Sequence, residues 1–503
     1  MEKTKFRCHF SIIFENTAAV WIFLAVALFG QIQNVIEFAN SLKKEDMWAV
    51  LGGVLTLLGI TLLVFVYNFF VWRKTFIILE NQTLVIQRLT WNRKENTFGI
   101  KNISNINLEQ NLFEMIMGTY KIKIDTNSLS TADKTDIKIV LSKDKAIAFK
   151  NQIMEQIHGE EMVHTETLVP EDYDIKYELN DIVKNSLIAT PLFAIFAFVG
   201  VVVLIIVGLT QVKLGDDMLD FAKNAFGGYL AIALAIMGTI GTTVKNIIKF
   251  YAFRVKRFED RLLIGYGLLK KRNYEIPIDM INAIKIKQST IARFFKFYSL
   301  EIINVGVNDE NSEAAFLVLY AKKAQFDELL NRVLPEFVSS TDENIKLQPK
   351  SVWKIKVIGM IFWTIVLAVF VIFIKMSEIP FAPTIGFVAG ATAIYVMILV
   401  ISICNYKTEG ICVGEDFLGA SSGTFFKSTT LLKYDKIQYV DLRQGPISRK
   451  LGLTHGYIYI LAALLNRICK FGYFPQEDMD KIHQKMMEST IHKSNLQELP
   501  TAE

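Results

Sequence analysis

The chain has 503 residues, of which 51% are hydrophobic and 21% are charged, with a formal net charge of +5. So high an apolar fraction in a chain long enough for about three domains excludes a single soluble globule, and the low net charge excludes a dense nucleic-acid-binding surface. The apolar and the charged residues must therefore occupy different segments.

Six segments of 18 residues or more contain no Asp, Glu, Lys or Arg. About 20 apolar residues in an α-helix cross a hydrocarbon core of about 30 Å. The fourth segment is the weakest, because it contains four glycines. We expect six transmembrane helices, within residues 16–36, 47–72, 185–212, 224–244, 357–374 and 379–406.

The six segments form three pairs, because the connections 37–46, 213–223 and 375–378 are short, whereas the stretches between pairs exceed a hundred residues. Short connections join antiparallel helices, so the long stretches and both termini should lie on one side of the membrane. Lys and Arg residues near the ends of the spans are concentrated on that side, which by the positive-inside rule is cytoplasmic. The sequence therefore predicts a multi-pass cell-membrane protein with its termini and soluble domains in the cytoplasm.

The pairs begin near residues 16, 185 and 357, so a unit of about 170 residues occurs three times. In each unit a hairpin of two helices precedes a soluble domain. The hairpins are expected at 16–72, 185–244 and 357–406, and the soluble domains at 73–158, 251–337 and 407–490.

Each soluble domain begins with short β-prone runs and ends with a helical pattern of apolar residues three or four positions apart. The three helical patterns are Phe149, Ile153 and Ile157; Phe326, Leu330 and Val333; and Met479, Ile482 and Met486. We expect a small β-sandwich or open barrel, with the C-terminal helix covering an end or an open edge.

A glutamine recurs at the end of an alternating strand in each copy: Gln110, Gln288 and Gln444. A short turn with bulky side chains follows it. Eight residues after the glutamine, copies one and three have Gly118 and Gly452, whereas copy two has Lys296, so the turn of copy two is expected to differ in backbone conformation. We expect each glutamine amide to bond main-chain groups of its own turn.

Copy three reads YDKIQYVDLRQGPISRKLGL over Tyr434–Leu453, which resembles the signature of membrane-anchored bacterial pleckstrin-homology-like (PH-like) domains. The motif is recognisable in copy two and degenerate in copy one. A hairpin before each of three such domains is similar to the YdbT-like family of Gram-positive bacteria. This resemblance implies PH-like (YdbS-like) β-sandwiches, no known catalysis, and a setting in tolerance of membrane-active peptides.

The turn after the glutamine is the best candidate interaction surface, because it places apolar residues beside cations. The alternative interpretation, which we favour from sequence alone, is that these side chains plug the open end of the β-sandwich. The candidate residues of the motif and turn are Gln110, Gly118, Gln288, Arg293, Phe294, Lys296, Gln444, Gly445, Pro446, Arg449, Lys450 and Gly452.

Motifs for catalysis are absent from the sequence: it contains no phosphate-binding loop, GxSxG elbow, HExxH or paired Cys-x-x-Cys. We therefore predict no catalytic, cofactor-binding or metal-binding residues. The soluble domains carry net charges of only +4, +3 and +2 over residues 73–158, 251–337 and 405–490, which suits anionic lipids better than nucleic acid.

The leading hypothesis is a non-enzymatic membrane scaffold that binds lipid headgroups or partner proteins at the inner membrane face. The alternative is a component of a transporter for an apolar substrate, with the hairpins bundled around a path. The absence of charged residues within the spans argues against a powered pump. The oligomeric state does not follow from the sequence.

Overall fold

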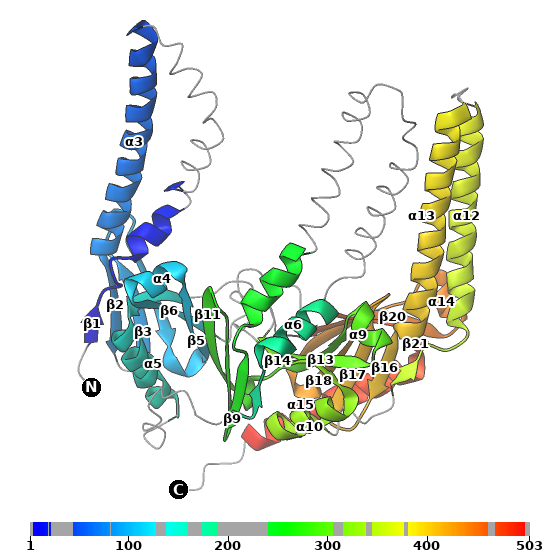
Figure 1. The fold of residues 1–503 in the computed structure, drawn as a ribbon. Helices are drawn as coiled ribbons and strands as arrows, with labels where there is room; N and C mark the ends of the chain where they lie inside the picture. The colour runs from blue at the N-terminus through cyan, green and yellow to red at the C-terminus, as the bar shows by residue number, and fades with distance from the viewer. Residues whose placement is uncertain are drawn as a thin grey trace. The chain divides into compact units, whose positions relative to one another are not determined.

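The computed structural model describes residues 4–18, 20–21, 44–80, 82–126, 137–158, 173–189, 240–304, 315–338, 345–376, 381–460 and 468–497. The chain divides into two compact units. The N-terminal unit comprises residues 1–127, 135–169 and 270–272, and the C-terminal unit comprises the remainder. Figure 1 shows the ribbon.

The N-terminal unit contains module 1, which has two antiparallel sheets. The first sheet has the strand order β1-β2-β3-β4, and in the second β6 pairs with β5 and β7. Alternating aliphatic side chains of both sheets form one core, closed by Ala146, Phe149 and Ile153 of helix α5 (Lys143–His158). The strands are β1 (Thr4–Phe6), β2 (Thr75–Glu80), β3 (Thr83–Arg88), β4 (Lys94–Gly99), β5 (Ile103–Asn111), β6 (Thr119–Thr126) and β7 (Ile137–Ser142).

The C-terminal unit contains modules 2 and 3, which repeat this strand order. Module 2 ends in helix α10 (Lys323–Val333), and module 3 ends in helix α15 (Gln476–Gln497). Module 2 has strands β8 (Ile175–Lys176), β9 (Arg254–Phe258), β10 (Arg261–Tyr266), β11 (Lys270–Pro277), β12 (Ala283–Gln288), β13 (Phe297–Ile303) and β14 (Ala315–Lys322). Module 3 has strands β15 (Lys346–Leu347), β16 (Gly410–Val413), β17 (Phe417–Ser422), β18 (Lys427–Lys433), β19 (Ile437–Arg443), β20 (Leu453–Ile460) and β21 (Ile468–Pro475).

The first strand of every module precedes the apolar segments, which the local sequence pattern does not predict. Strands β1, β8 and β15 pair with β2, β9 and β16, which follow those segments. The apolar segments are therefore inserted between the first and second strands of each sheet. We call the end of a module at which the chain leaves for these segments, and returns from them, its helix-bearing end.

Modules 2 and 3 share one seven-stranded sheet, because β12 pairs antiparallel with β18. They also share core residues: Ala283 and Ile303 of module 2 pack in the core of module 3, while Phe417 and Leu431 of module 3 pack in the core of module 2. A fragment limited to residues 407–490 would lack β15 and leave the edge of β18 unpaired. Such a fragment is therefore not a complete folding unit.

Within the described residues, one helix is clearly long and apolar enough to cross a membrane, Val352–Ile374. It lies in α12 (Val352–Met376), beside α13 (Phe381–Thr408), and shorter apolar helices cover Gly59–Arg73 and Ile394–Thr408. The expectation of six transmembrane helices is thus not supported by the described residues. Helix α3 (Lys44–Arg73) overlaps the span expected at 47–72, whereas most of 16–36, 185–212 and 224–244 lies outside the described ranges.

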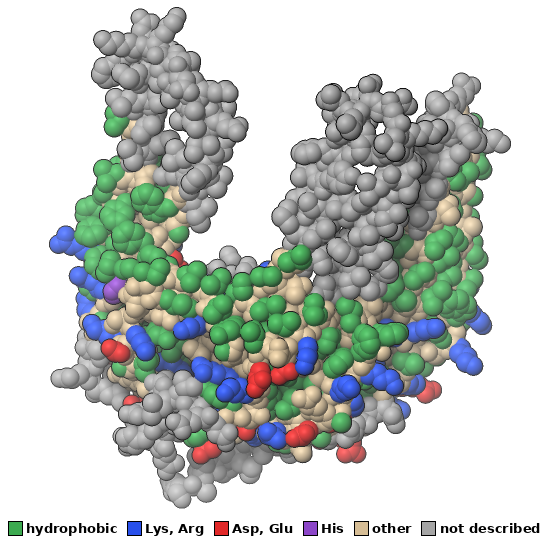
Figure 2. Space-filling model, viewed as in Figure 1, with side chains coloured by type: hydrophobic (Ala, Val, Ile, Leu, Met, Phe, Trp, Pro, Cys, Tyr) green, Lys and Arg blue, Asp and Glu red, His purple; other side chains and the backbone are tan. Residues whose placement is uncertain are grey.

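Helices α12 and α13 form the third expected hairpin. The hydroxyls of Thr364 and Tyr395 lie 2.7 Å apart, and the rings of Trp353 and Tyr406 are 5.8 Å apart near the helix-bearing end of module 3. Aromatic residues of this kind are frequent at membrane–water boundaries. In Figure 2 hydrophobic side chains cover the described parts of these helices, whereas charged side chains gather on the β-modules.

Candidate functional site

The recurring glutamine lies where a strand gives way to a short helix. Gln110 and Gln288 are buried, and each donates from Nε2 to the carbonyl of the first residue of the next strand, Thr119 at 3.0 Å and Phe297 at 3.1 Å. These are the expected main-chain bonds, and they hold the two strands at a fixed separation around the turn.

Gln444 differs from its two counterparts. Its side chain is exposed, and Nε2 donates to the hydroxyl of Thr454 at 2.7 Å and to Oε1 of Gln476 at 3.1 Å. The amide therefore ties the turn to the start of helix α15 through side chains, and the main-chain bond expected for copy three is not formed.

The turn itself is a short α-helix in all three modules: α4 (Leu112–Met117), α9 (Thr290–Phe294) and α14 (Pro446–Lys450). The helices start in different ways. Asn111 and Glu114 form a reciprocal capping box before α4, the Ser289 hydroxyl accepts from the amide of Ala292 in α9, and Pro446 occupies the first turn of α14.

The short helices end alike, which corrects one prediction. Lys296 has φ +59°, almost the value of +64° at Gly118 and Gly452, so the turn of module 2 does not differ at this position. The left-handed residue ends the helix and turns the chain into the next strand. In module 2 a lysine adopts it at a cost of about 1–2 kcal/mol, because the flanking helix and strand fix the backbone path.

Several side chains of these helices project into solvent. The exposed fractions of Ile116 and Phe294 are 83% and 81%, and Leu112, Phe295 and Ile447 are also exposed. They do not plug the open end of the sandwich, so the interpretation favoured from sequence is wrong for these five residues. The cations beside them, Arg449, Lys450 and Lys296, are exposed as well.

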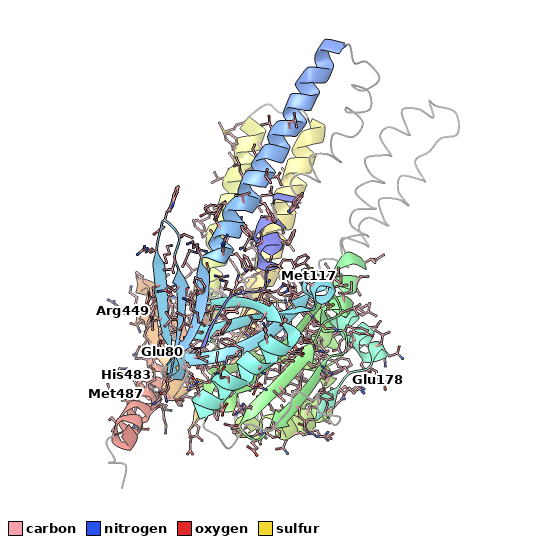
Figure 3. The ribbon with its side chains drawn as sticks, turned by 90° about the vertical axis from the view of Figure 1, so that its left-hand side faces the viewer. Glu80, Met117, Glu178, Arg449, His483 and Met487 are labelled. Carbon is pink, nitrogen blue, oxygen red and sulfur yellow. The ribbon has the colours of Figure 1, made fainter. Side chains whose placement is uncertain are left out.

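The short helices of modules 1 and 2 lie at the helix-bearing ends. In module 1 the ring of Phe14 is 6.4 Å from Phe113 of α4 and 5.7 Å from Phe65 of α3. In Figure 3 Met117, the last residue of α4, lies level with the lower end of α3, whereas Glu80 lies further down the module. In module 2 the Ser289 hydroxyl donates to the carbonyl of Ile188, at the end of helix α6 (Leu179–Ile188), over 2.6 Å.

A second loop in every module adds exposed apolar side chains at the same end. In module 1 the loop after β3 exposes Leu89 and Trp91, and the Leu89 amide donates to the carbonyl of Lys74, next to α3. The loop after β10 exposes Leu268 and Leu269, and the loop after β17 exposes Phe425 and Phe426.

The second loops of modules 2 and 3 are bonded to the returning helices. The Leu268 amide donates to the carbonyl of Ile248 over 3.0 Å, and the hydroxyl of Thr408, the last residue of α13, donates to the carbonyl of Gly423. Sequence reasoning missed these loops, although apolar pairs in turns between β-runs, such as Leu268-Leu269 and Phe425-Phe426, are a visible signal.

Two further motif residues, Arg293 and Gly445, take part in hydrogen bonds. Arg293 of α9 donates from Nη1 to the carbonyl of Thr424 over 3.3 Å, which joins the short helix of module 2 to the second loop of module 3. Gly445 precedes α14, and its carbonyl accepts from the Ser448 hydroxyl. Within the described ranges, no three His, Cys, Asp or Glu side chains lie close enough together to hold a metal ion.

These features define a class of protein: tandem β-modules of PH-like type, each interrupted by long apolar segments. The family model described as Bacterial PH domain matches residues 23–157, 192–336 and 361–486, and the chain belongs to this family. Each match covers an apolar segment together with the β-module that follows it. The match confirms the resemblance indicated by the motif of copy three.

One curated relative is the UPF0699 transmembrane protein YdbT of Bacillus subtilis (strain 168). It is 24% identical over 306 residues, which cover 56% of this chain and 60% of the relative. The alignment thus spans less than two thirds of that relative's length. No solved structure matches the chain.

Proposed function

We propose that the chain is a non-enzymatic, multi-pass membrane protein whose three modules dock on the inner membrane face and act there as a scaffold for lipids or partner proteins. One observation carries this proposal: in all three modules, the short helix and the second loop expose apolar side chains. A soluble surface does not normally repeat such a pattern, because each exposed Phe or Leu gives up about 1.5–3 kcal/mol of burial.

The charge around these side chains supports docking on lipid. Arg73, Lys74, Arg88 and Arg93 flank the second loop of module 1. Anionic inner-leaflet lipids attract each nearby Lys or Arg by about 1 kcal/mol. Apolar groups that enter the headgroup boundary, with cations just outside it, are typical of interfacial binding.

Three docking sites on one chain make weak contacts effective. Once the apolar segments anchor the chain, each further contact is intramolecular, and its effective concentration is set by the short connection to the helix. We extend the hairpin formed by α12 and α13 to modules 1 and 2, which gives six spans with cytoplasmic modules. The relative, which is named as a transmembrane protein, supports a place in the membrane, and tolerance of membrane-active peptides is the proposed setting.

The test is complementation of cells from which the gene for this protein has been deleted. The readout is survival in the presence of a cationic membrane-active peptide. The docking variant carries Phe294→Ser and Phe295→Ser, and the control carries Met487→Ser and Ile491→Ser, which remove two exposed apolar side chains from α15. Wild type and control are expected to restore tolerance, and the docking variant to lose most of it at an equal protein level in the membrane fraction.

Two results would count against the proposal. If the docking variant protects cells as well as wild type does, the exposed phenylalanines are not needed for the function. If wild type itself gives no protection, peptide tolerance is the wrong setting.

A further inference from the structure

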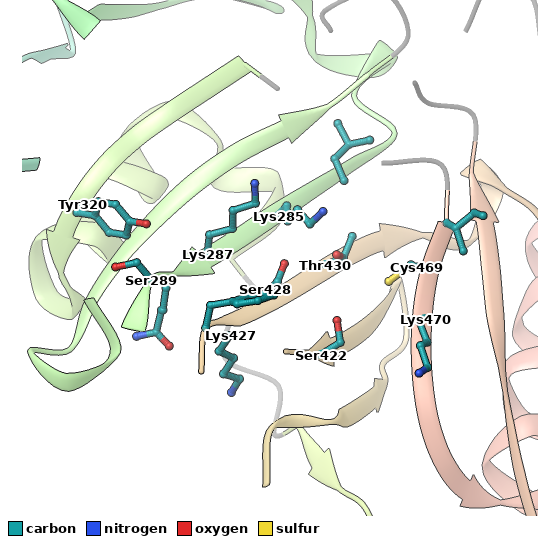
Figure 4. Close-up of a pocket in the computed structure, with 14 residues that line it drawn as sticks. Lys285, Lys287, Ser289, Tyr320, Ser422, Lys427, Ser428, Thr430, Cys469 and Lys470 are labelled. Atoms are coloured by element: carbon teal, nitrogen blue, oxygen red, sulfur yellow. The ribbon is translucent and has the colours of Figure 1, made fainter. Parts of the chain in front are cut away.

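A cavity of about 480 Å³ lies on one face of the seven-stranded sheet, where modules 2 and 3 join. Strands β12, β13, β14, β17 and β18 line it, and the start of β21 lies along another side. Figure 4 shows Lys285 and Lys287 rising from the same face of β12, with Ser428 and Thr430 on the neighbouring β18. No single module contains this cavity.

Strand register explains how the polar groups come together. Lys287 pairs with Ser299 on β13 and with Ser428 on β18, and Ser428 pairs in turn with Ser422 on β17. Directly paired residues of an antiparallel sheet lie on the same face. Ser299 lies within hydrogen-bond reach of Tyr320 on β14, so a row of hydroxyls crosses the sheet with Lys287 in its middle. Lys285 pairs with Thr430 in the next row.

The balance of charge around the cavity is positive. Lys287 Nζ lies 2.6 Å from a carboxylate oxygen of Glu301, which is buried, while the lysine side chain remains 39% exposed. An ammonium has three donors, so this ion pair does not exhaust them. Burial, and then the charge of Lys287, lower the pKa of Lys285, although Glu301 opposes that shift. A bound anion would favour the charged form of Lys285 and so offset both its burial and its repulsion by Lys287.

Ser428 provides a second, independent observation. The residue is 8% exposed and lines the cavity, and its hydroxyl oxygen has no hydrogen-bond partner among the described residues. Buried hydroxyls nearly always have a partner, so an unsatisfied one in a polar cavity indicates that a ligand group completes the site.

The cavity is suited to binding rather than to covalent chemistry. Cys469 lies in its lining, but burial raises the pKa of the thiol, despite a hydrogen bond with Thr430 and the charge of Lys285. A thiol held protonated is a poor nucleophile. The lysines and hydroxyls instead supply donors of the kind that phosphate oxygens accept.

The position of the cavity indicates where its ligand comes from. The hydroxyl of Ser289, a lining residue, donates to the carbonyl of Ile188 at the end of α6. The lining residue Ser422 is followed by Gly423, whose carbonyl accepts from the hydroxyl of Thr408 at the end of α13. The cavity therefore adjoins two helix-bearing ends, at the level where we place the lipid headgroups.

We infer that this cavity binds a phosphate group, with Lys285, Lys287 and the Ser428 hydroxyl as its donors, and that the phosphate belongs to an anionic lipid headgroup. The lipid source rests on the membrane docking proposed above. Phe426 of the second loop of module 3 lines the cavity, whereas Phe294 and Phe295 of α9 do not. The two proposals can therefore fail separately.

The test uses the full chain in detergent and native mass spectrometry. The probes are dioctanoyl phosphatidic acid, dioctanoyl phosphatidylglycerol, dioctanoyl phosphatidylcholine and inorganic phosphate. Wild type is expected to retain one molecule of either anionic lipid more strongly than phosphatidylcholine. Lys285→Gln and Ser428→Ala are each expected to weaken retention about fivefold to tenfold, because each removes one donor to a charged oxygen.

Lys287 is left unchanged in these variants, because it neutralises buried Glu301. The matched control is Lys481→Gln, an exposed lysine of α15 that lies outside the cavity. It removes the same charge and should leave retention unchanged. Thermal unfolding checks that Lys285→Gln and Ser428→Ala are as stable as wild type, as expected when a desolvated charge or an unsatisfied hydroxyl is removed.

Each outcome decides the inference. Loss of anionic-lipid retention in the two cavity variants alone supports the lipid site. Retention of inorganic phosphate but of no lipid, with the same loss in the variants, supports a phosphate site and contradicts the lipid source. Absence of any bound anion, or equal retention by wild type, the cavity variants and Lys481→Gln, overturns the inference.

Discussion

Replacing Phe471 by alanine is expected to lower the free energy of unfolding of the C-terminal unit by about 3–5 kcal/mol, the usual range for a buried Phe-to-Ala change. Phe471 is fully buried in the core of module 3. Its ring lies so close to Gly456 that a Cβ there would meet it at 3.0 Å. Removal of the ring leaves a cavity against a rigid sheet that cannot collapse to fill it.

The loss of stability should extend to module 2. Ala283 and Ile303 belong to the same core, and β12 and β18 form one continuous ladder. Hydrogen exchange of the full chain should therefore show faster exchange in β12 and β13, as well as in β20 and β21. Met487→Ala, at an exposed site on α15, should change stability by less than about 0.5 kcal/mol. Unchanged protection of module 2 in Phe471→Ala would show that the modules unfold independently.

Replacing Lys121 by methionine is expected to cost the N-terminal unit about 3 kcal/mol, because it leaves a buried carboxylate without its counter-ion. Lys121 Nζ lies 3.3 Å from Glu114, which is 2% exposed, and also bonds Glu15. Burial alone would lower the pKa of Lys121, but the hydrogen bonds and charges of the two glutamates raise it above its ordinary value.

The same cation joins three parts of module 1. The Glu114 carboxylate accepts from the main-chain amide of Asn111 at 2.8 Å and so caps the start of α4. Glu15 lies just before the first apolar segment. Denaturant unfolding of Lys121→Met measures the loss. Adding Glu114→Gln should recover more than half of it, because the amide oxygen still caps α4 without a buried charge. No recovery in the double variant would mean that the effect comes from packing of the lysine stem.

The period-two strands and the closing helices could be predicted from local sequence. Phe326, Leu330 and Val333 are buried in α10, as their spacing predicts, and Met479 and Ile482 are buried in α15. By contrast, the first strand of each module could not be found. Strands β8 and β15 are two residues long and lie on the other side of an apolar segment from their partners, so no periodicity reveals them.

For the candidate site, too, local sequence predicts some features and not others. The turns after Gln110 and Gln288 were recognised because their residues are adjacent in sequence, although the exposure of Phe294 depends on the direction in which α9 points. The left-handed Lys296 was missed, because a lysine gives no sign of positive φ. The cavity could not be predicted, since Lys285 and Ser428 are brought together only by the pairing of β12 with β18.

The most direct test of membrane docking is the depth of the exposed side chains in a bilayer. Spin labels would be placed on Cys variants of Ile116, Phe294 and, as the control on α15, Met487, which Figure 3 places away from the long helices of its unit. Cys8 and Cys404 are partly exposed and would first be replaced by serine, so that the spin label reacts with the introduced cysteine. Cys412 and Cys469 are buried and would be left in place. In vesicles with anionic lipid, the labels at 116 and 294 should collide more with oxygen than with a water-soluble nickel complex, and the label at 487 should do the reverse. If all three labels are equally accessible to nickel, the modules do not dock on the membrane through these side chains.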